Sequence, residues 1–259
     1  MTSTRSLRLA ALVAVAAFAS ACSDSTAPGN LQPAELSQVL SEMQPASLTP
    51  LNAQISAAPS AALSAPVPSS CSYDATAKSF VCPSVTVTGI TVSRSFTLFD
   101  ASGNPQSAFD RATTASVRMQ TSFAGTVASG GSTVTIDQQQ DVTMSGLLTG
   151  ARTINGTSLG HVAGTIGNGT TTTPVASTIS TTITNLVIPA SSTGANRFPS
   201  SGTVAATTTT TVGALPASTV NATITFDGTS KAAVTVTTNG RTTSCTVDLT
   251  AQSAALCTV

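Results

Sequence analysis

The chain has 259 residues and no net charge, because ten basic residues balance ten acidic ones. Only 8% of its residues are charged, so its polar surface must consist mainly of uncharged side chains such as Ser and Thr. Nucleic-acid recognition requires clustered Lys and Arg that neutralise phosphates, and this composition argues against such a partner. With no Trp and 3% aromatic residues, the core must be built from small aliphatic side chains.

The N-terminus has the features of an export signal. Arg5 and Arg8 precede an apolar run over residues 9–18, which is shorter than the ~20 apolar residues of a transmembrane helix. The small residues 19–21 then lead directly into Cys22. This pattern resembles the lipobox of bacterial lipoprotein precursors. An ordinary signal peptide also ends in small residues, but nothing in it requires the cysteine.

The resemblance implies cleavage of residues 1–21 and attachment of a diacylglyceryl thioether to Cys22, with a fatty acid such as palmitate on its new amino group. Two or three acyl chains give durable membrane attachment, because each buried CH2 contributes ~0.8 kcal/mol. In similar lipoproteins an aspartate directly after the cysteine favours the inner membrane, whereas this chain has Ser23 there and Asp24 one further on. We therefore expect a lipid-anchored protein of the bacterial cell envelope, at the outer rather than the inner membrane.

Three segments separate this cysteine from the main body. Residues 22–30 are small and polar and indicate a flexible tether, and residues 45–70 are a connector rich in Pro, Ala and Ser. Between them, residues 31–44 predict a short amphipathic helix whose apolar residues recur at i, i+3, i+4 and i+7: Leu36, Val39, Leu40 and Met43. So short a helix is marginal in water by itself, so we expect its apolar stripe to lie on the body.

The four remaining cysteines form two close pairs, Cys71 with Cys82 and Cys245 with Cys257. Three pairings are possible, but the local one is favoured because both segments share the pattern Ser-Cys-x-x-Asp-x-Thr-Ala-x-Ser, typical of a strand, a turn and a return strand. Disulfides fit an oxidising compartment. A disulfide that closes so short a loop stabilises the folded state by at most roughly 2 to 3 kcal/mol. A zinc site is the alternative, but His161 is the only histidine and no Cys-x-x-Cys spacing occurs.

From Cys71 onward the sequence alternates with period two, which predicts β-strands with one wet side. The clearest run is 115–123, where apolar side chains alternate with Ser, Arg, Gln and Ser. An earlier run changes phase at Gly89, where we expect a β-bulge. The strongest turn signal is Asn239-Gly240, a two-residue hairpin turn that puts one set of side chains on a single face: Ala232, Val234, Val236, Cys245, Val247 and Leu249.

These patterns predict an all-β domain over residues 71–259, an antiparallel meander of about ten to twelve strands with one buried and one solvated face. A curled single sheet or barrel-like form, with the helix of residues 31–44 across its open face, fits the thin core best. A two-sheet β-sandwich uses the same alternation and stays as the alternative. The length also allows two small domains instead of one.

Candidate catalytic groups are sparse. His161 is opposite in phase to Val162 and is expected to face solvent, and no G-x-S-x-G motif supplies a nucleophile. Asp137 and Asp141 on one continuous strand would be separated by ~13 Å, beyond the carboxylate separations of glycosidases. If the segment were a turn, the oxygen ligands for calcium would still be lacking. We therefore expect no enzyme, no cofactor and no metal site.

Two classes of function stay open. One is a structural or interaction lipoprotein of the cell envelope, with the sheet's hollow filled by its own side chains. The other is a binding module for a lipid or acyl chain, which would resemble periplasmic lipoprotein carriers in architecture only. A dry pocket of several hundred Å3 under the helix would indicate the carrier. We expect a small hollow, because the helix has long side chains able to fill it, namely Leu36, Val39, Leu40 and Met43.

Overall fold

The computed structural model describes residues 70–87, 89–129, 132–167, 172–190 and 198–249. The predicted tether, helix and connector lie outside these residues, as do Cys22 and Cys257. Within the described part of the chain no helix is long and apolar enough to cross a membrane.

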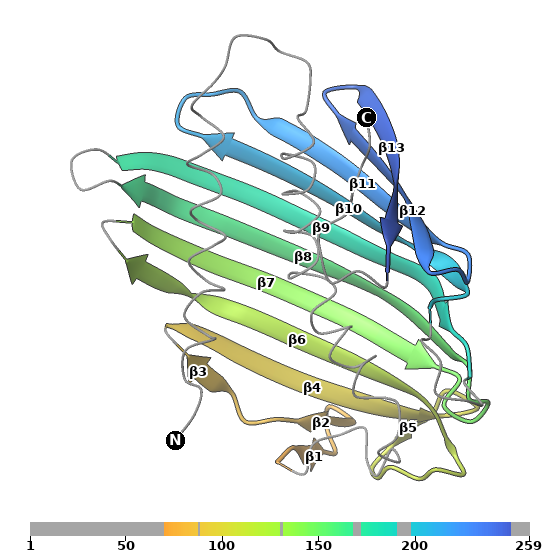
Figure 1. Ribbon diagram of the computed structural model, residues 1–259. Helices are drawn as coiled ribbons and strands as arrows, with labels where there is room; N and C mark the ends of the chain where they lie inside the picture. The colour runs from red at the N-terminus through yellow and green to blue at the C-terminus, as the bar shows by residue number, and fades with distance from the viewer. Residues whose placement is uncertain (1–69, 88, 130–131, 168–171, 191–197, 250–259) are drawn as a thin grey trace, which may run out of the picture.

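The described residues form one antiparallel sheet of 13 strands (Figure 1). The order β1-β2-β4-β6-β7-β8-β9-β10-β11-β12-β13 is a meander, and β3 and β5 pair with the outer edge of β4. The sheet is curled but not closed, and the sandwich alternative is not formed by the described residues. The strands are β1 (Ser72–Asp74), β2 (Ser79–Val81), β3 (Val85–Val87), β4 (Ile90–Asp100), β5 (Pro105–Gln106), β6 (Thr114–Ser129), β7 (Ser132–Ser145), β8 (Arg152–Gly167), β9 (Thr172–Ile188), β10 (Ser201–Val212), β11 (Ser218–Phe226), β12 (Lys231–Thr238) and β13 (Arg241–Asp248).

The sequence predicted fewer strands because four of them are only two or three residues long. The phase change at Gly89 also has a different origin from the expected bulge. Val87 pairs with Ile90, so β3 and β4 form a tight hairpin and Gly89, with a φ of 85°, lies in its turn. A two-residue turn reverses the chain and shifts the phase as a bulge would, so the sequence pattern did not distinguish the two.

The expected hairpin register after Asn239 and Gly240 is confirmed. Thr238 pairs with Arg241 and Val234 with Cys245. Asn239 has a φ of 50° and Gly240 a φ of 79°, which are the left-handed values that a two-residue hairpin turn requires. Because the turn fixes the register, Val234 and Val236 fall on the same face, where both are buried.

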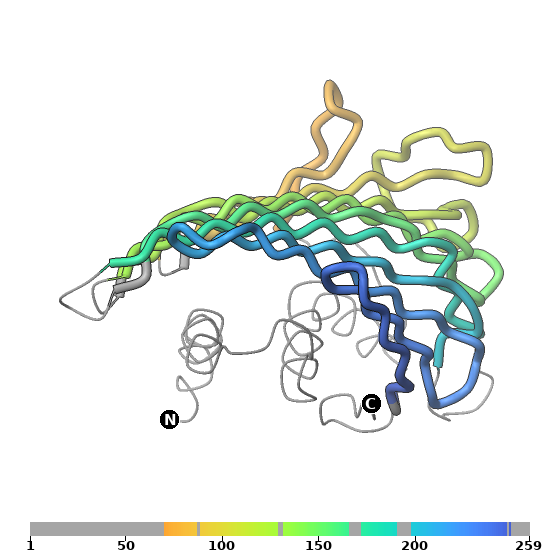
Figure 2. Tube along the Cα trace, turned by 90° about the horizontal axis from the view of Figure 1, so that it is seen from above, coloured from red at the N-terminus to blue at the C-terminus, as the bar shows by residue number. Residues whose placement is uncertain are grey.

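The sheet is arched, with β12 and β13 curling toward the hollow side (Figure 2). We call the two sides the concave and the convex face. Because side chains alternate along each strand and the register aligns neighbouring strands, the apolar side chains of the sheet fall on the concave face. From β7 to β12 they form one cluster: Val142, Ile154, Ile183, Leu186, Ile188, Val204, Ala222, Ile224, Phe226, Ala232, Val234 and Val236. A second cluster surrounds Phe96 and Leu98 of β4, where Phe80, Phe109, Val117 and Met119 pack against them.

The strong curl is accompanied by local irregularities in the ladder. Between β9 and β10 the register shifts at Gly202, whose φ is 114°. A Cβ atom there would lie 2.5 Å from the carbonyl oxygen of Asn185, so only glycine allows this approach of the two backbones. A further shift between β8 and β9 lies at Asn155, between Ile154 and Gly156.

Candidate functional site

The convex face is an array of hydroxyl groups. Thr157 of β8 stands beside Thr182 of β9. Ala205 of β10 comes next in this row, which then continues with Thr223, Thr235 and Ser244 on β11, β12 and β13. Several neighbouring threonines hydrogen-bond to each other across strands, with oxygen separations of 2.9 to 3.1 Å: Thr126 with Thr135, Thr209 with Thr219, and Thr237 with Thr242. The face is therefore polar, nearly uncharged and internally hydrogen-bonded.

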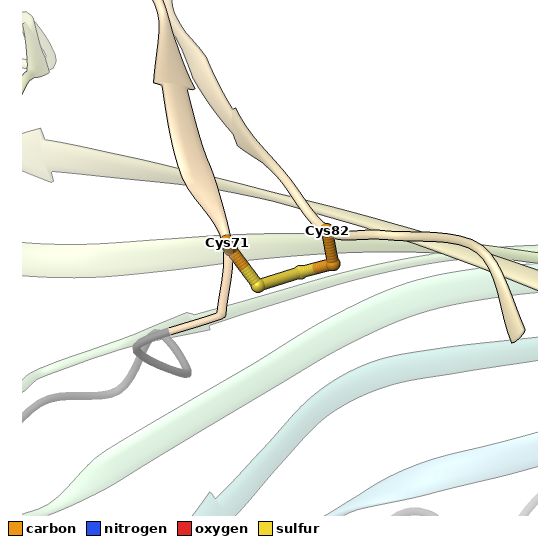
Figure 3. Close-up of a disulfide and its surroundings, with 2 residues drawn as sticks. All are labelled: Cys71 and Cys82. Atoms are coloured by element: carbon orange, nitrogen blue, oxygen red, sulfur yellow. A yellow bond between two sulfur atoms is a disulfide. The ribbon is translucent and has the colours of Figure 1, made fainter.

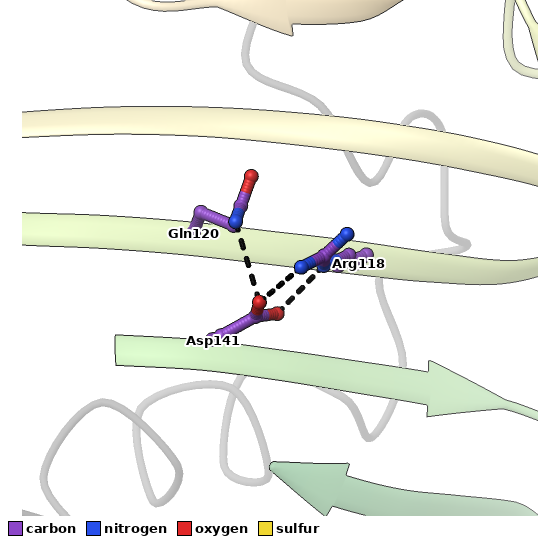
Figure 4. Close-up of polar contacts among 3 residues, drawn as sticks. All are labelled: Arg118, Gln120 and Asp141. Atoms are coloured by element: carbon purple, nitrogen blue, oxygen red, sulfur yellow. Dashed lines mark hydrogen bonds and ion pairs between the residues drawn. The ribbon is translucent and has the colours of Figure 1, made fainter. Parts of the chain in front are cut away.

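One charged cluster interrupts this array at β6 and β7 (Figure 4). Arg118 donates through Nε to Asp141 Oδ1 at 2.7 Å and through a terminal nitrogen to Oδ2, which makes a two-pronged ion pair. Gln120 Nε2 donates to the same Oδ2 at 3.3 Å. Asp141 is directly opposite Gln120 on the neighbouring strand, and Arg118 is diagonal to it, so strand register alone brings the three together.

This cluster keeps its charges at neutral pH. The hydrogen bonds from Arg118 lower the pKa of the Asp141 carboxyl, although partial burial opposes the shift. The same contact raises the pKa of Arg118. With 44% and 34% of the two side chains exposed, solvent screens the attraction, and the pair carries no net charge as a unit.

The ion pair borders a shallow open groove of about 470 Å3 on the convex face. Phe99 at the end of β4 and Asn155 of β8 contribute to its lining, together with Thr143, Thr157 and Thr182. Asn155 sits at the register shift of β8, and its side-chain oxygen accepts a hydrogen bond from the backbone N–H of Asn185 at 2.7 Å. Its side-chain NH2 group is left to donate elsewhere. Sequence reasoning missed this groove, because its residues come from five strands, β4 and β6 to β9, whose register no local pattern fixes.

The histidine predicted to face solvent does so. His161 is exposed on β8, directly opposite Asp137 of β7 and Thr178 of β9. Its Nδ1 lies 3.3 Å from Thr178 Oγ1. A carboxylate, an imidazole and a hydroxyl thus stand in one row, but among the described residues no hydrogen bond joins Asp137 to the imidazole. The backbone N–H groups beside the row are hydrogen-bonded to the neighbouring strands. They are therefore not free to form the oxyanion hole that acyl transfer needs.

Asp137 and Asp141 were expected to lie on one continuous strand, and this is confirmed. Asp137 and Asp141 lie on the continuous strand β7, four residues apart. This spacing puts both on the convex face at ~13 Å from each other, and only Asp141 belongs to the ion pair. In the part of the chain that the structure describes, no group of three or more His, Cys, Asp or Glu side chains is placed to hold a metal ion.

The first predicted disulfide is present. Cys71 and Cys82 are bonded across the base of the β1–β2 hairpin, with their Cα atoms 4.0 Å apart (Figure 3). Both sulfurs pack against the cluster around Phe96 and Leu98. Cys245 is also disulfide-bonded. Its predicted partner, Cys257, is outside the described residues, so this second pairing stays a prediction, as does lipidation of Cys22.

The concave face is not uniformly apolar. Polar side chains that are 5% to 9% exposed cross it on β6 to β9: Thr121, Gln140, Ser158, Ser177 and Thr181. Gln138 Nε2 donates to Ser158 Oγ at 3.1 Å, beside a small enclosed pocket of about 30 Å3. A pocket of this size holds about one water molecule. The concave face therefore combines the aliphatic cluster of β7 to β12 with buried polar side chains on β6 to β9.

Comparison with known proteins adds no relative from which a role can be transferred. No protein-family model, no curated protein and no solved structure matches the chain. Any function must therefore be argued from the sheet, its two faces and the N-terminal sequence.

Proposed function

We propose that this chain is a lipoprotein of the bacterial cell envelope with a structural or interaction role. Cys22 would carry the lipid anchor, and the 13-stranded sheet would stand in the oxidising space beyond the inner membrane. The Cys71–Cys82 disulfide supports this compartment, because disulfides persist where thiols are not kept reduced. The membrane, reached through the anchor, is the partner that the sequence implies, and the outer membrane is favoured by Ser23.

The main support for a structural role is that the concave face has both apolar and polar buried side chains. A sheet with one apolar face needs a second layer. Over β6 to β9 that layer must also lie against polar side chains such as Ser158 and Ser177, which hydrogen-bond to Gln138 and Thr210 within the sheet. An acyl chain matches only the aliphatic side chains, whereas a polypeptide segment supplies both apolar and polar side chains. The face is therefore better matched to protein than to lipid.

Residues 31–44 fit this second layer. Leu36, Leu40 and Met43 would meet the aliphatic cluster, while the two glutamates of the segment, Glu35 and Glu42, offer negative charge. The concave face has a complementary cation, because exposed Arg94 stands opposite Thr121 at the polar end of the face. The connector of residues 45–70 is long enough to let the segment reach back across the sheet.

Deletion of residues 31–44 tests the proposal. If the segment is structural, its deletion should clearly lower the free energy of unfolding or cause the protein to aggregate, because the apolar face of the sheet becomes exposed. If the segment is instead a lid over a ligand, the shortened protein should be as stable as the full chain but should no longer bind a fluorescent fatty acid. Deletion of residues 51–64, which removes the same length from the connector, is the matched control and should leave stability unchanged. A shortened protein that is monomeric, equally stable and deficient in fatty-acid binding would favour the carrier alternative instead.

A further inference from the structure

We propose that the groove beside Arg118 and Asp141 is a binding site for a neutral saccharide. The groove volume of about 470 Å3 lies within the roughly 300 to 1,000 Å3 typical of small-ligand sites. It is the place on the convex face where a charged pair, a carboxamide and an aromatic ring border one hollow. This inference stands independently of the proposed structural role, which concerns the concave face.

The polar groups of the groove have hydrogen-bonding capacity left over. A guanidinium has five N–H donors, and Arg118 uses two of them on Asp141, so three remain. The NH2 group of Asn155 also remains, because the Asn185 contact uses only its oxygen. Asp141 accepts from Arg118 and Gln120 and still has room for a further donor, since a carboxylate offers about four lone-pair sites. A ligand that both donates and accepts at neighbouring atoms is therefore required.

Adjacent hydroxyl groups on a sugar ring meet this requirement, because each hydroxyl both donates and accepts. Phe99, at the end of β4 in the same lining, supplies an apolar wall for the C–H face of the ring. The pair Arg118–Asp141 is neutral as a unit, so a net charge on the ligand would gain nothing from it. An anionic ligand would meet the Asp141 carboxylate, and a cationic one the Arg118 guanidinium.

The arrangement binds and does not hydrolyse. Glycoside cleavage uses two carboxyl groups at most ~9.5 Å apart, and within the described residues Asp141 is the only carboxylate in the lining. The nearest carboxylate on its strand, Asp137, is ~13 Å along β7 by the rise per residue. Because the groove is shallow and open, the affinity for a single disaccharide should be in the millimolar range.

Saturation-transfer NMR on the full chain, kept in a detergent without a sugar headgroup, tests the site. The probes are the neutral disaccharides cellobiose, maltose and diacetylchitobiose, with galacturonic acid as an anionic comparison. We expect at least one disaccharide to bind, and Asp141→Asn or Arg118→Gln to weaken it by about tenfold, the effect of losing one hydrogen bond to a charged group. Galacturonic acid should bind more weakly than the neutral ligand.

Asp137→Asn is the matched control, because it makes the same change on the same strand and face but outside the groove lining. It should bind like the unaltered protein. The proposal is wrong if no disaccharide gives a signal at tens of millimolar, if Asp141→Asn binds as well as Asp137→Asn, or if galacturonic acid binds best. Circular dichroism of each variant separates loss of binding from loss of fold, and a negative result would leave the structural role untouched.

Discussion

The Cys71–Cys82 bond gives a quantitative test of how the edge of the sheet is stabilised. Replacing both cysteines with Ala opens a covalent loop whose ends are 11 residues apart. The loop-entropy relation converts that separation to about 2.8 kcal/mol of unfolding free energy at 25 °C. Contacts of the sulfurs with the cluster around Phe96 and Leu98 are lost as well, so the measured loss should be between about 2 and 5 kcal/mol.

Urea unfolding followed by far-ultraviolet circular dichroism measures this loss. The double substitution is preferable to a reducing agent, because reduction would also break the disulfide of Cys245. Ala77→Ser in the exposed turn of the same hairpin is the control, and it should change stability by less than about 0.5 kcal/mol. A loss below about 1 kcal/mol for the double variant would show that non-covalent contacts, such as the edge-on packing of Tyr73 on Phe80 at 5.2 Å, hold the hairpin without the covalent link.

Two further predictions concern charge and anchoring. The lowered pKa of Asp141 means that its contribution is fully present above the ordinary aspartate pKa of 3.8 and is lost as pH falls through the lowered value. A double-mutant cycle of Arg118→Gln and Asp141→Asn should therefore give a coupling below about 1 kcal/mol at pH 7, because both side chains are substantially exposed. The coupling should decrease as the pH falls below 3.8, and a coupling that grows on acidification would refute the assignment. Mass spectrometry of the membrane fraction should find a lipid on Cys22, and Cys22→Ser should release the protein from membranes. An unmodified, secreted chain would contradict the lipoprotein interpretation.

Local sequence patterns sufficed for the strands and their faces. Alternation over residues 115–123 predicted which side of β6 is apolar, because side chains of a strand point alternately to its two faces. The Asn239-Gly240 turn fixed the register of β12 and β13 through backbone geometry that is local to four residues. The Cys71–Cys82 pairing followed for the same reason, since both cysteines belong to one short hairpin.

What the sequence left open depends on contacts between distant segments. Alternation is the same in a curled sheet and in a sandwich, so only the tertiary structure decided that one sheet forms and stays open. The positions of the register shifts at Asn155 and Gly202 determine how the strands cross, and neither has a distinctive local signal. The Arg118–Asp141 pair and the row of Asp137, His161 and Thr178 arise because strand register aligns residues that are 17 to 24 positions apart. Such alignment is a collective property of the whole meander, in which each strand's position is set by its neighbours, and no single segment of the sequence contains it.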